Sequence, residues 1–193
     1  RRAHLHLRLA SRVLLRLAEF RAMHPAQLDK RARKVEWGRW LGPGAPLRAE
    51  ASVRRSRIWH AGAAASRVLA AARDATGAPE GPGGLRLLVR IEDDLCTVSL
   101  DLSGEPLHRR GGEKEVGKAP LRETLAAGFL AEAGWRPGEA LLDPMCGSGT
   151  IVLEAAEIAA GLAAGRRRGF AFEALVGHDA AAWAAERAAG AVP

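Results

Sequence analysis

The feature that most constrains this chain is a short apolar segment that runs into a glycine loop and then into a helix. Two leucines precede Asp143, and the loop that follows carries Gly147 and Gly149. Residues 151–164 continue with the apolar spacing of a helix. We expect residues 140–142 to form a short buried strand, so the order strand, loop, helix predicts the beginning of an α/β domain. Because glycines lack blocking side chains, such a loop lets a ligand approach backbone amides and the positive end of a helix.

Three ligand classes use this arrangement, and the residues separate them. A phosphate loop for nucleoside triphosphates needs a lysine before Thr150, where this chain has Gly149. A dinucleotide fingerprint needs a third glycine where Val152 stands, which counts against an oxidoreductase. The form that remains is that of methyltransferases, in which an acid at the strand end precedes the loop that holds the methionine part of S-adenosylmethionine. The candidate cofactor-binding residues in this string are Asp143, Pro144, Met145, Cys146, Gly147, Ser148, Gly149 and Thr150.

Charge is distributed unevenly along the chain. Residues 1–73 hold 17 Lys and Arg against four acids, whereas residues 74–193 hold 12 against 18. A surface with such an excess attracts polyanions through counterion release, and nucleic acid is the usual one. A GC-rich genome produces the same arginine bias without any function, so charge alone leaves nucleic-acid binding open. The run Arg54, Arg55 and Arg57 is the best candidate for RNA contact, and Arg166 to Arg168 are expected to form a solvated loop.

The first hundred residues predict a compact α+β module. We expect extended structure over residues 4–20, where Leu5, Leu7 and Leu9 alternate with polar residues. This alternation also argues against a transit peptide, which the arginine-rich start superficially resembles. Helices are expected at 27–34 and 62–75, the second ending at Gly77, and a strand at 47–53. Two strands at 85–91 and 95–102 flank the acidic turn 92–94 as a hairpin, with Cys96 as a small core residue.

A glycine-rich connector at 111–117 separates this module from the rest. Beyond it Pro120 is expected in the first turn of a helix whose Leu121, Leu125 and Phe129 share one face, and Gly134 ends that helix. Asp179 is expected to begin a last helix over residues 180–190. The tryptophans Trp37, Trp40, Trp59 and Trp183 are expected in the core or at interfaces rather than as base-stacking platforms.

The string Asp-Pro-Met-Cys-Gly-Ser-Gly-Thr at 143–150 resembles the methyltransferase family that modifies guanine N2 in bacterial large-subunit ribosomal RNA. The resemblance extends over residues 98–111 and 118–126, and to Ser56-Arg57 and His60-Ala61-Gly62. It departs from the family at Gly112, where members usually have an aromatic residue, and the acidic Glu113 follows. This departure puts RNA contact at the neighbouring His108, Arg109 and Arg110 in question.

The resemblance implies an α+β THUMP-type RNA-binding region at residues 1–106, a linker at 107–118, and part of a Rossmann-like domain at 119–193. It also implies S-adenosylmethionine as cofactor, Pro120 beside it, and ribosomal RNA as partner, with His108, Arg109 and Arg110 as further RNA contacts. The family's catalytic motif is an Asn/Asp-Pro-Pro-aromatic sequence, but this chain has no Asn, Tyr or Pro-Pro pair. We therefore assign no catalytic residue and expect an incomplete enzyme that cannot methylate alone. The alternative is a non-catalytic RNA-binding module with a vestigial cofactor loop.

The two cysteines lie fifty positions apart, without partners at metal-ligand spacing, so neither a metal site nor a disulfide is expected. No apolar run approaches the roughly 20 residues that a membrane helix needs. A cytoplasmic location is the simplest expectation.

Overall fold

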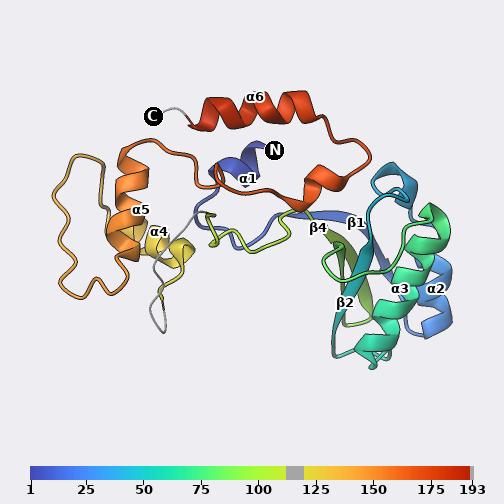
Figure 1. The fold of residues 1–193 in the computed structure, drawn as a ribbon. Helices are drawn as coiled ribbons and strands as arrows, with labels where there is room; N and C mark the ends of the chain where they lie inside the picture. The colour runs from blue at the N-terminus through green and yellow to red at the C-terminus, as the bar shows by residue number, and fades with distance from the viewer. Residues whose placement is uncertain (112–119, 192–193) are drawn as a thin grey trace. The chain divides into compact units, whose positions relative to one another are not determined.

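A computed structural model describes residues 1–111 and 120–191 of the chain (Figure 1). The helices and strands follow in this order: α1 (Arg2–His6), β1 (Leu14–Arg21), α2 (Pro25–Ala32), the 3-10 turn η1 (Trp37–Arg39), β2 (Leu47–Arg54), α3 (Ala61–Thr76), β3 (Leu85–Glu92), β4 (Leu95–Asp101), α4 (Glu123–Glu132), α5 (Thr150–Ala159), η2 (Ala171–Ala174) and α6 (Ala180–Ala191).

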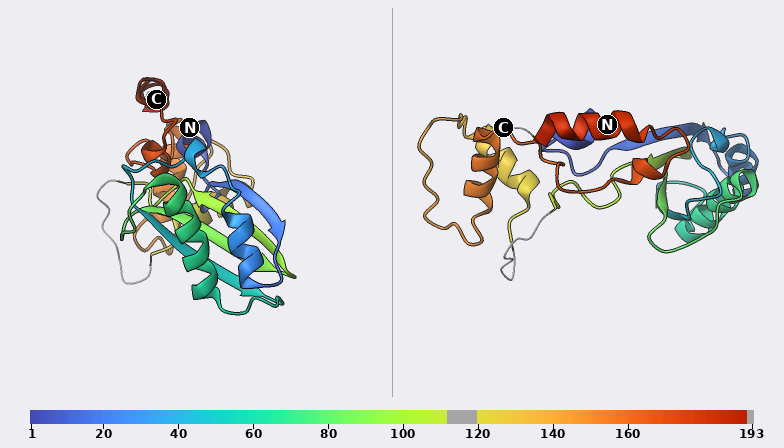
Figure 2. Two further views of the ribbon diagram at one scale, coloured as in Figure 1. Left: turned by 90° about the vertical axis from the view of Figure 1, so that its right-hand side faces the viewer. Right: turned by 45° about the horizontal axis from the view of Figure 1, so that its top comes forward.

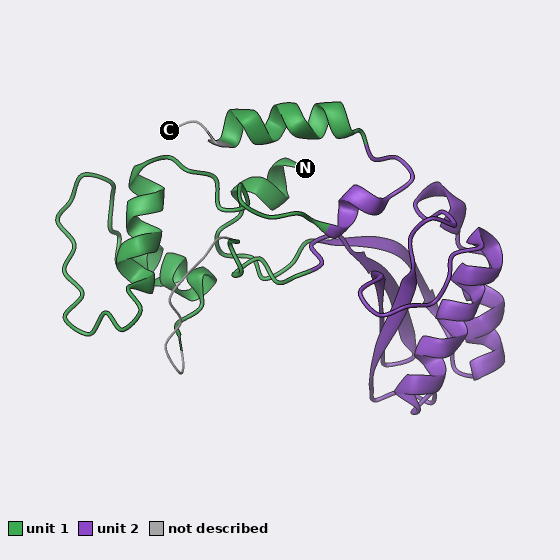
Figure 3. Cartoon of the chain, in the orientation of Figure 1, with its two compact units in different colours: residues 1–13, 105–170, 179–193 green, residues 14–104, 171–178 purple. Residues whose placement is uncertain are grey.

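The chain folds as two compact units that are not contiguous in sequence (Figure 3). The sheet unit comprises residues 14–104 and 171–178, and the loop unit comprises residues 1–13, 105–170 and 179–193. This division differs from the expected split near residue 106, because the first thirteen residues belong with the second half of the chain. Residues 112–118 of the expected linker, which include Gly112 and Glu113, lie outside the described residues.

The sheet unit is built on a four-stranded sheet with the order β1-β4-β3-β2. Strand β2 runs parallel to β3, and the other two pairs are antiparallel. The expected hairpin is confirmed: β3 and β4 pair across the turn at Asp93 and Asp94, whose φ angles are 49° and 63°. Two consecutive positive φ angles match the right-handed twist of the strands, which is why short polar residues occupy this turn.

Helices α2 and α3 lie side by side and α3 packs on β2 and β3 (Figures 1 and 2). Alternate residues of β3, among them Leu87, Val89 and Ile91, are buried. Helix α3 presents Val68 and several alanines to the core, which lets it approach closely, and it ends at Gly77 with φ 70° as expected. Cys96 is also fully buried as expected, and the loss of solvation raises the pKa of its thiol to about 12.

The expectation of extended structure over residues 4–20 is wrong in its first half. Residues 2–6 form helix α1, and strand β1 begins only at Leu14. Leu5 is buried whereas Leu7 and Leu9 are exposed, so the alternation does not mark one face of a strand. Helix α1 contacts α6 within the loop unit, and this packing overrides the local pattern.

The expected buried strand at residues 140–142 is absent. The segment has no regular structure, and the side chain of Leu142 is 86% exposed. A strand needs a neighbour for its amide and carbonyl groups, and no strand lies among the described residues of the loop unit. Helix α5 ends at Ala159, five residues earlier than expected, shortly before Gly161 with φ 67°.

Other expectations concern exposed apolar residues and termini. Leu125 and Phe129 of α4 are about half exposed, so the expected apolar stripe does not face a core in the described residues.

Asp179 does begin the last helix, since its Oδ1 accepts from the Ala182 amide at 2.9 Å. Within residues 1–111 and 120–191, no helix is both long and apolar enough to cross a membrane.

Candidate cofactor loop and arginine clusters

The glycine loop is ordered by contacts among its own residues. The Asp143 carboxylate accepts a hydrogen bond from the Met145 amide at 3.1 Å, and the Gly149 amide donates to the Cys146 carbonyl at 2.7 Å. Gly147 and Gly149 have φ angles of 53° and 72°, which side-chain-bearing residues rarely adopt. Glycine adopts these angles without strain, so the backbone conformation of the loop favours glycine at both positions.

The loop places an uncapped helix start beside an open surface. Gly149 is the N-cap of α5 and has no side chain that could accept from the first amides of the helix. Met145 is 90% exposed, and Pro144, Cys146 and Gly147 are exposed as well. The loop that leads into α5 is therefore accessible to a ligand.

Pro120 does not occupy the first turn of a helix, which corrects that expectation. It is exposed, and α4 begins three residues later at Glu123, with Arg122 as N-cap. Helix α4 packs against α5. The short segment from Pro120 to α4 therefore belongs to the same unit as the glycine loop.

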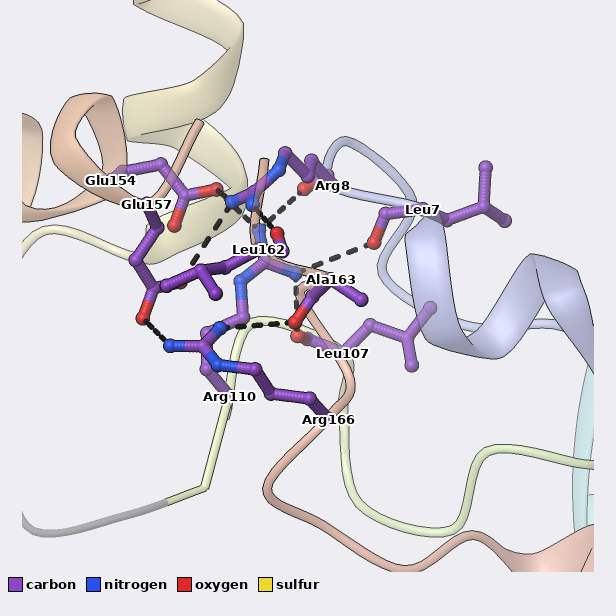
Figure 4. A network of polar contacts seen from close by, with 9 residues as sticks. All are labelled: Leu7, Arg8, Leu107, Arg110, Glu154, Glu157, Leu162, Ala163 and Arg166. Atoms are coloured by element: carbon purple, nitrogen blue, oxygen red, sulfur yellow. Dashed lines mark hydrogen bonds and ion pairs between the residues drawn. The ribbon is translucent and has the colours of Figure 1, made fainter. Parts of the chain in front are cut away.

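A buried carboxylate on α5 anchors the helix that carries the loop (Figure 4). The Glu154 side chain is only 2% exposed. Its Oε1 accepts from Arg8 Nη1 at 2.6 Å and from Arg110 Nη2 at 3.0 Å. Arg8 also donates to the carbonyl of Leu162, and Arg110 donates to the carbonyls of Leu7, Arg8 and Leu107. A charge removed from water needs this many partners, so the network holds three separate chain segments together.

A second pair extends this network. Arg166 Nη2 donates to Glu157 Oε1 at 2.6 Å, and Arg166 Nη1 donates to the Ala163 carbonyl at 3.0 Å. Burial opposes ionisation of Glu157, but the hydrogen bond and charge of Arg166 outweigh it, so the pKa of this carboxyl is lowered.

Arg168 donates to the carbonyls of Glu105, Pro106 and Arg109. The expected solvated loop at 166–168 is therefore wrong for Arg166 and Arg168, whose guanidiniums are engaged in internal contacts, and only Arg167 is exposed.

The structure brings Arg54, Arg55 and Arg57 together at the end of β2, next to the acidic hairpin turn. Arg55 Nη2 lies 3.2 Å from Glu92 and 3.1 Å from Asp93, and Arg54 Nη1 lies 3.6 Å from Glu92. The Arg57 amide donates to Asp94 at 2.8 Å, and its side chain is 71% exposed. These arginines are accessible, but neighbouring carboxylates offset much of their charge.

The other RNA candidates, His108, Arg109 and Arg110, belong to the loop unit and do not act as one patch. Arg110 is committed to Glu154, as described above. Arg109 is exposed and pairs with Glu105 at 2.7 Å. His108 is half-buried, and the loss of solvation, reinforced by nearby arginines, lowers its pKa.

Two functional features were missed from the sequence. Glu154 interrupts the apolar run of α5, and this signals that its carboxylate has a buried partner. The sequence does not identify the partners, because Arg8 and Arg110 are distant from Glu154 along the chain. Trp59 is 79% exposed, which excludes the core position that was one of the two expected for it. No group of three His, Cys, Asp or Glu side chains suited to a metal ion occurs among residues 1–111 and 120–191.

The chain is similar to known methyltransferases in sequence and in structure. Residues 110–191 match the family model described as RMKL-like, methyltransferase domain. The chain is 42% identical over 190 residues to the ribosomal RNA large subunit methyltransferase K/L of Methylococcus capsulatus, covering 91% of this chain and 26% of that protein.

Among solved structures, a Listeria monocytogenes protein described as a predicted N6-adenine-specific DNA methylase superposes with a TM-score of 0.89 at 30% identity, over 98% of this chain and 52% of that one. SMU.472, whose crystal structure is a complex with SAH, gives a TM-score of 0.87 at 26% identity, over 97% of this chain and 52% of that one. The chain thus spans about a quarter of its curated relatives and about half of the solved structures. The glycine loop and α5 lie in the region that matches the RMKL-like methyltransferase domain.

Proposed function

We propose that this chain is part of an S-adenosylmethionine-dependent methyltransferase that modifies guanine N2 of large-subunit ribosomal RNA. The observation that carries the proposal is the loop at 143–150: an acid, two glycines with positive φ and an uncapped helix start, within a region that matches a methyltransferase domain. In this proposal residues 1–106 supply a THUMP-type RNA-binding region, and residues 119–193 supply the start of the Rossmann-like domain.

The residues of the loop fit the methionine part of S-adenosylmethionine. Its α-carboxylate is an anion that suits the amides at the start of α5, and its ammonium group suits the carboxylate of Asp143. A side chain at Gly149 would require a strained backbone, and its Cβ would lie 3.5 Å from Val152. SAH, which is this cofactor without its methyl group, is present in the solved relative SMU.472. The proposed contacts are Pro120 and residues 143–150.

Ribosomal RNA is favoured over DNA as the substrate class. The relatives named for ribosomal RNA are 42% and 44% identical to this chain, whereas the one named for DNA is 30% identical. The exposed arginines Arg54, Arg55, Arg57 and Arg109 are the proposed RNA contacts in this chain. No catalytic residue is assigned within residues 1–193. The runner-up remains a non-catalytic RNA-binding module, and transfer of labelled methyl groups to ribosomal RNA by the full-length protein distinguishes the two.

Isothermal calorimetry with S-adenosylmethionine and SAH tests the cofactor site in the full-length protein. Gly149→Val should weaken binding at least tenfold, because it disturbs the turn that presents the amides of α5. Gly177→Val is the matched control, since a Cβ at Gly177 has open space and its φ is not positive. Circular dichroism checks that both variants fold. Equal cofactor affinity in the two variants would remove the loop from the binding site.

A further inference from the structure

The exposed indole of Trp59 lines a pocket of the sheet unit, and the sequence did not predict this pocket. The pocket has a volume of about 350 Å³, and its lining includes Trp59, His60, Met23, His24, Arg57 and Arg67. Trp59 is 79% exposed, so most of its indole surface is open to a binding partner, and Arg57 and Arg67 line the same pocket.

The helix starts give this pocket a fixed frame. His60 is the N-cap of α3, and its Nδ1 accepts from the Ala63 amide at 3.0 Å. His24 is the N-cap of α2, and its Nδ1 accepts from the Ala26 amide at 3.3 Å. The rings of Trp59 and His60 meet edge to face with centroids 5.6 Å apart. The indole is therefore positioned by a residue that is itself fixed by the start of α3.

The two arginines of the pocket differ in their surroundings. The Arg57 guanidinium lies 3.8 Å from Asp94 and donates to the Met23 sulfur at 3.1 Å. Arg67 is an exposed residue of α3 and has no carboxylate partner among residues 1–111 and 120–191. In contrast, Arg73 on the same helix pairs with Glu80 at 3.1 Å. The pocket thus joins an open aromatic face to an uncompensated positive charge.

We propose that this pocket binds an unpaired nucleotide of the RNA substrate, with the base stacked on Trp59 and an adjacent phosphate held by Arg67 and Arg57. An exposed aromatic face with nearby guanidiniums is the arrangement that recognises single-stranded RNA, because each base has a π-face and each nucleotide carries a phosphate. Double-stranded RNA keeps its bases stacked inside the helix and cannot use the indole in this way. The inference deepens the proposed function, on which it rests for the identity of the polyanion.

The test compares a short single-stranded RNA with a duplex of the same length, using the full-length protein and anisotropy of labelled RNA. Trp59→Ala should weaken binding of the single strand about five- to hundredfold, the range expected for one stacked base, and should change duplex binding less than threefold. Trp59→Phe keeps an aromatic face and should restore most of the affinity. Indole fluorescence should be quenched by the single strand in the wild type, and this quenching should be lost in Trp59→Phe even though the RNA still binds.

The charge is tested separately with two arginines of α3. Arg67→Ala should weaken binding and reduce the dependence of affinity on salt, whereas Arg73→Ala, whose charge is paired, should do neither. Wild-type affinity in Trp59→Ala, or no binding of single-stranded RNA by the wild-type protein, would overturn the inference. These RNA-binding measurements are independent of the calorimetric titration with S-adenosylmethionine. If the RNA prediction fails while S-adenosylmethionine still binds, the proposed cofactor site is unaffected.

Discussion

The interactions that stabilise the sheet unit differ from those that stabilise the loop unit. In the sheet unit four strands pair with one another and bury an apolar face under two helices. In the loop unit no strand occurs among the described residues, and guanidinium groups connect segments distant in sequence through Glu154, Glu157 and backbone carbonyls. The sheet unit has one large hydrophobic core, which is stabilised by non-directional burial. The loop unit adds directional, partly buried ion pairs to a smaller set of buried apolar residues, among them Leu5, Phe170 and Trp183.

The difference determines what each unit exposes. The sheet unit satisfies the backbone groups of its central strands internally, and its buried cysteine lies in the core. The loop unit leaves Leu142, Met145 and Cys146 at the surface around the proposed cofactor site. A binding loop needs accessible backbone, and accessible backbone is less protected from local opening.

The two cysteines make this contrast measurable, because one lies in each unit. Cys146 is exposed, whereas Cys96 is fully buried and its thiol pKa is raised to about 12. Under native conditions a thiol reagent should modify Cys146 at least about a thousandfold faster than Cys96, which reacts only when the sheet unit opens. Mass spectrometry of Cys96→Ser and Cys146→Ser variants assigns the rates. Similar rates at both positions would show that the sheet core is not closed.

Two leucines test the same contrast energetically. Leu100 is fully buried in β4, and Leu142 is 86% exposed at the position where a buried strand was expected. Leu100→Ala should lower the free energy of unfolding by about 2–5 kcal/mol, and Leu142→Ala by less than about 0.5 kcal/mol. Urea unfolding monitored by circular dichroism gives both values. A large loss in Leu142→Ala would mean that this segment is packed against something in solution.

The sequence predicts the sheet unit well because its pattern is local. The hairpin follows from apolar alternation on both sides of a short acidic turn, and the end of α3 follows from Gly77, whose positive φ suits glycine. Strand β2 and the burial of Cys96 follow from the same alternation. In each case the residues that determine the structure are neighbours in the sequence.

The loop unit is less predictable because its stabilising contacts are distant in sequence. Arg8 and Glu154 are 146 positions apart, and no periodicity reports such a pair. The segment at 140–142 has the composition of a buried strand, but burial of a strand depends on partners that its own residues do not supply. The glycine loop is an exception, because its conformation depends on the positive φ angles that Gly147 and Gly149 themselves permit. The candidate cofactor site is therefore recognisable from the sequence.

The smallest expected effect concerns acid sensitivity in the loop unit. Arg166 lowers the pKa of Glu157 in the folded protein, whereas in the unfolded chain the carboxyl has its ordinary pKa, near 4.3. A lowered folded pKa contributes stability that is fully present above the ordinary pKa and is lost as the pH falls through the folded pKa. Because Glu157 is still about a quarter exposed, this contribution should not exceed about 1 kcal/mol.

Glu157→Gln should therefore be less stable than the wild type at neutral pH, and the difference should shrink as the pH falls from 6 to 3. Glu132→Gln on α4 is the matched control, since Glu132 is exposed and should give no difference at any pH. Urea unfolding at several pH values measures the free energies. A difference between wild type and Glu157→Gln that stays constant down to pH 3, or that grows on acidification, would show that the Glu157–Arg166 pair does not stabilise the loop unit through its charge.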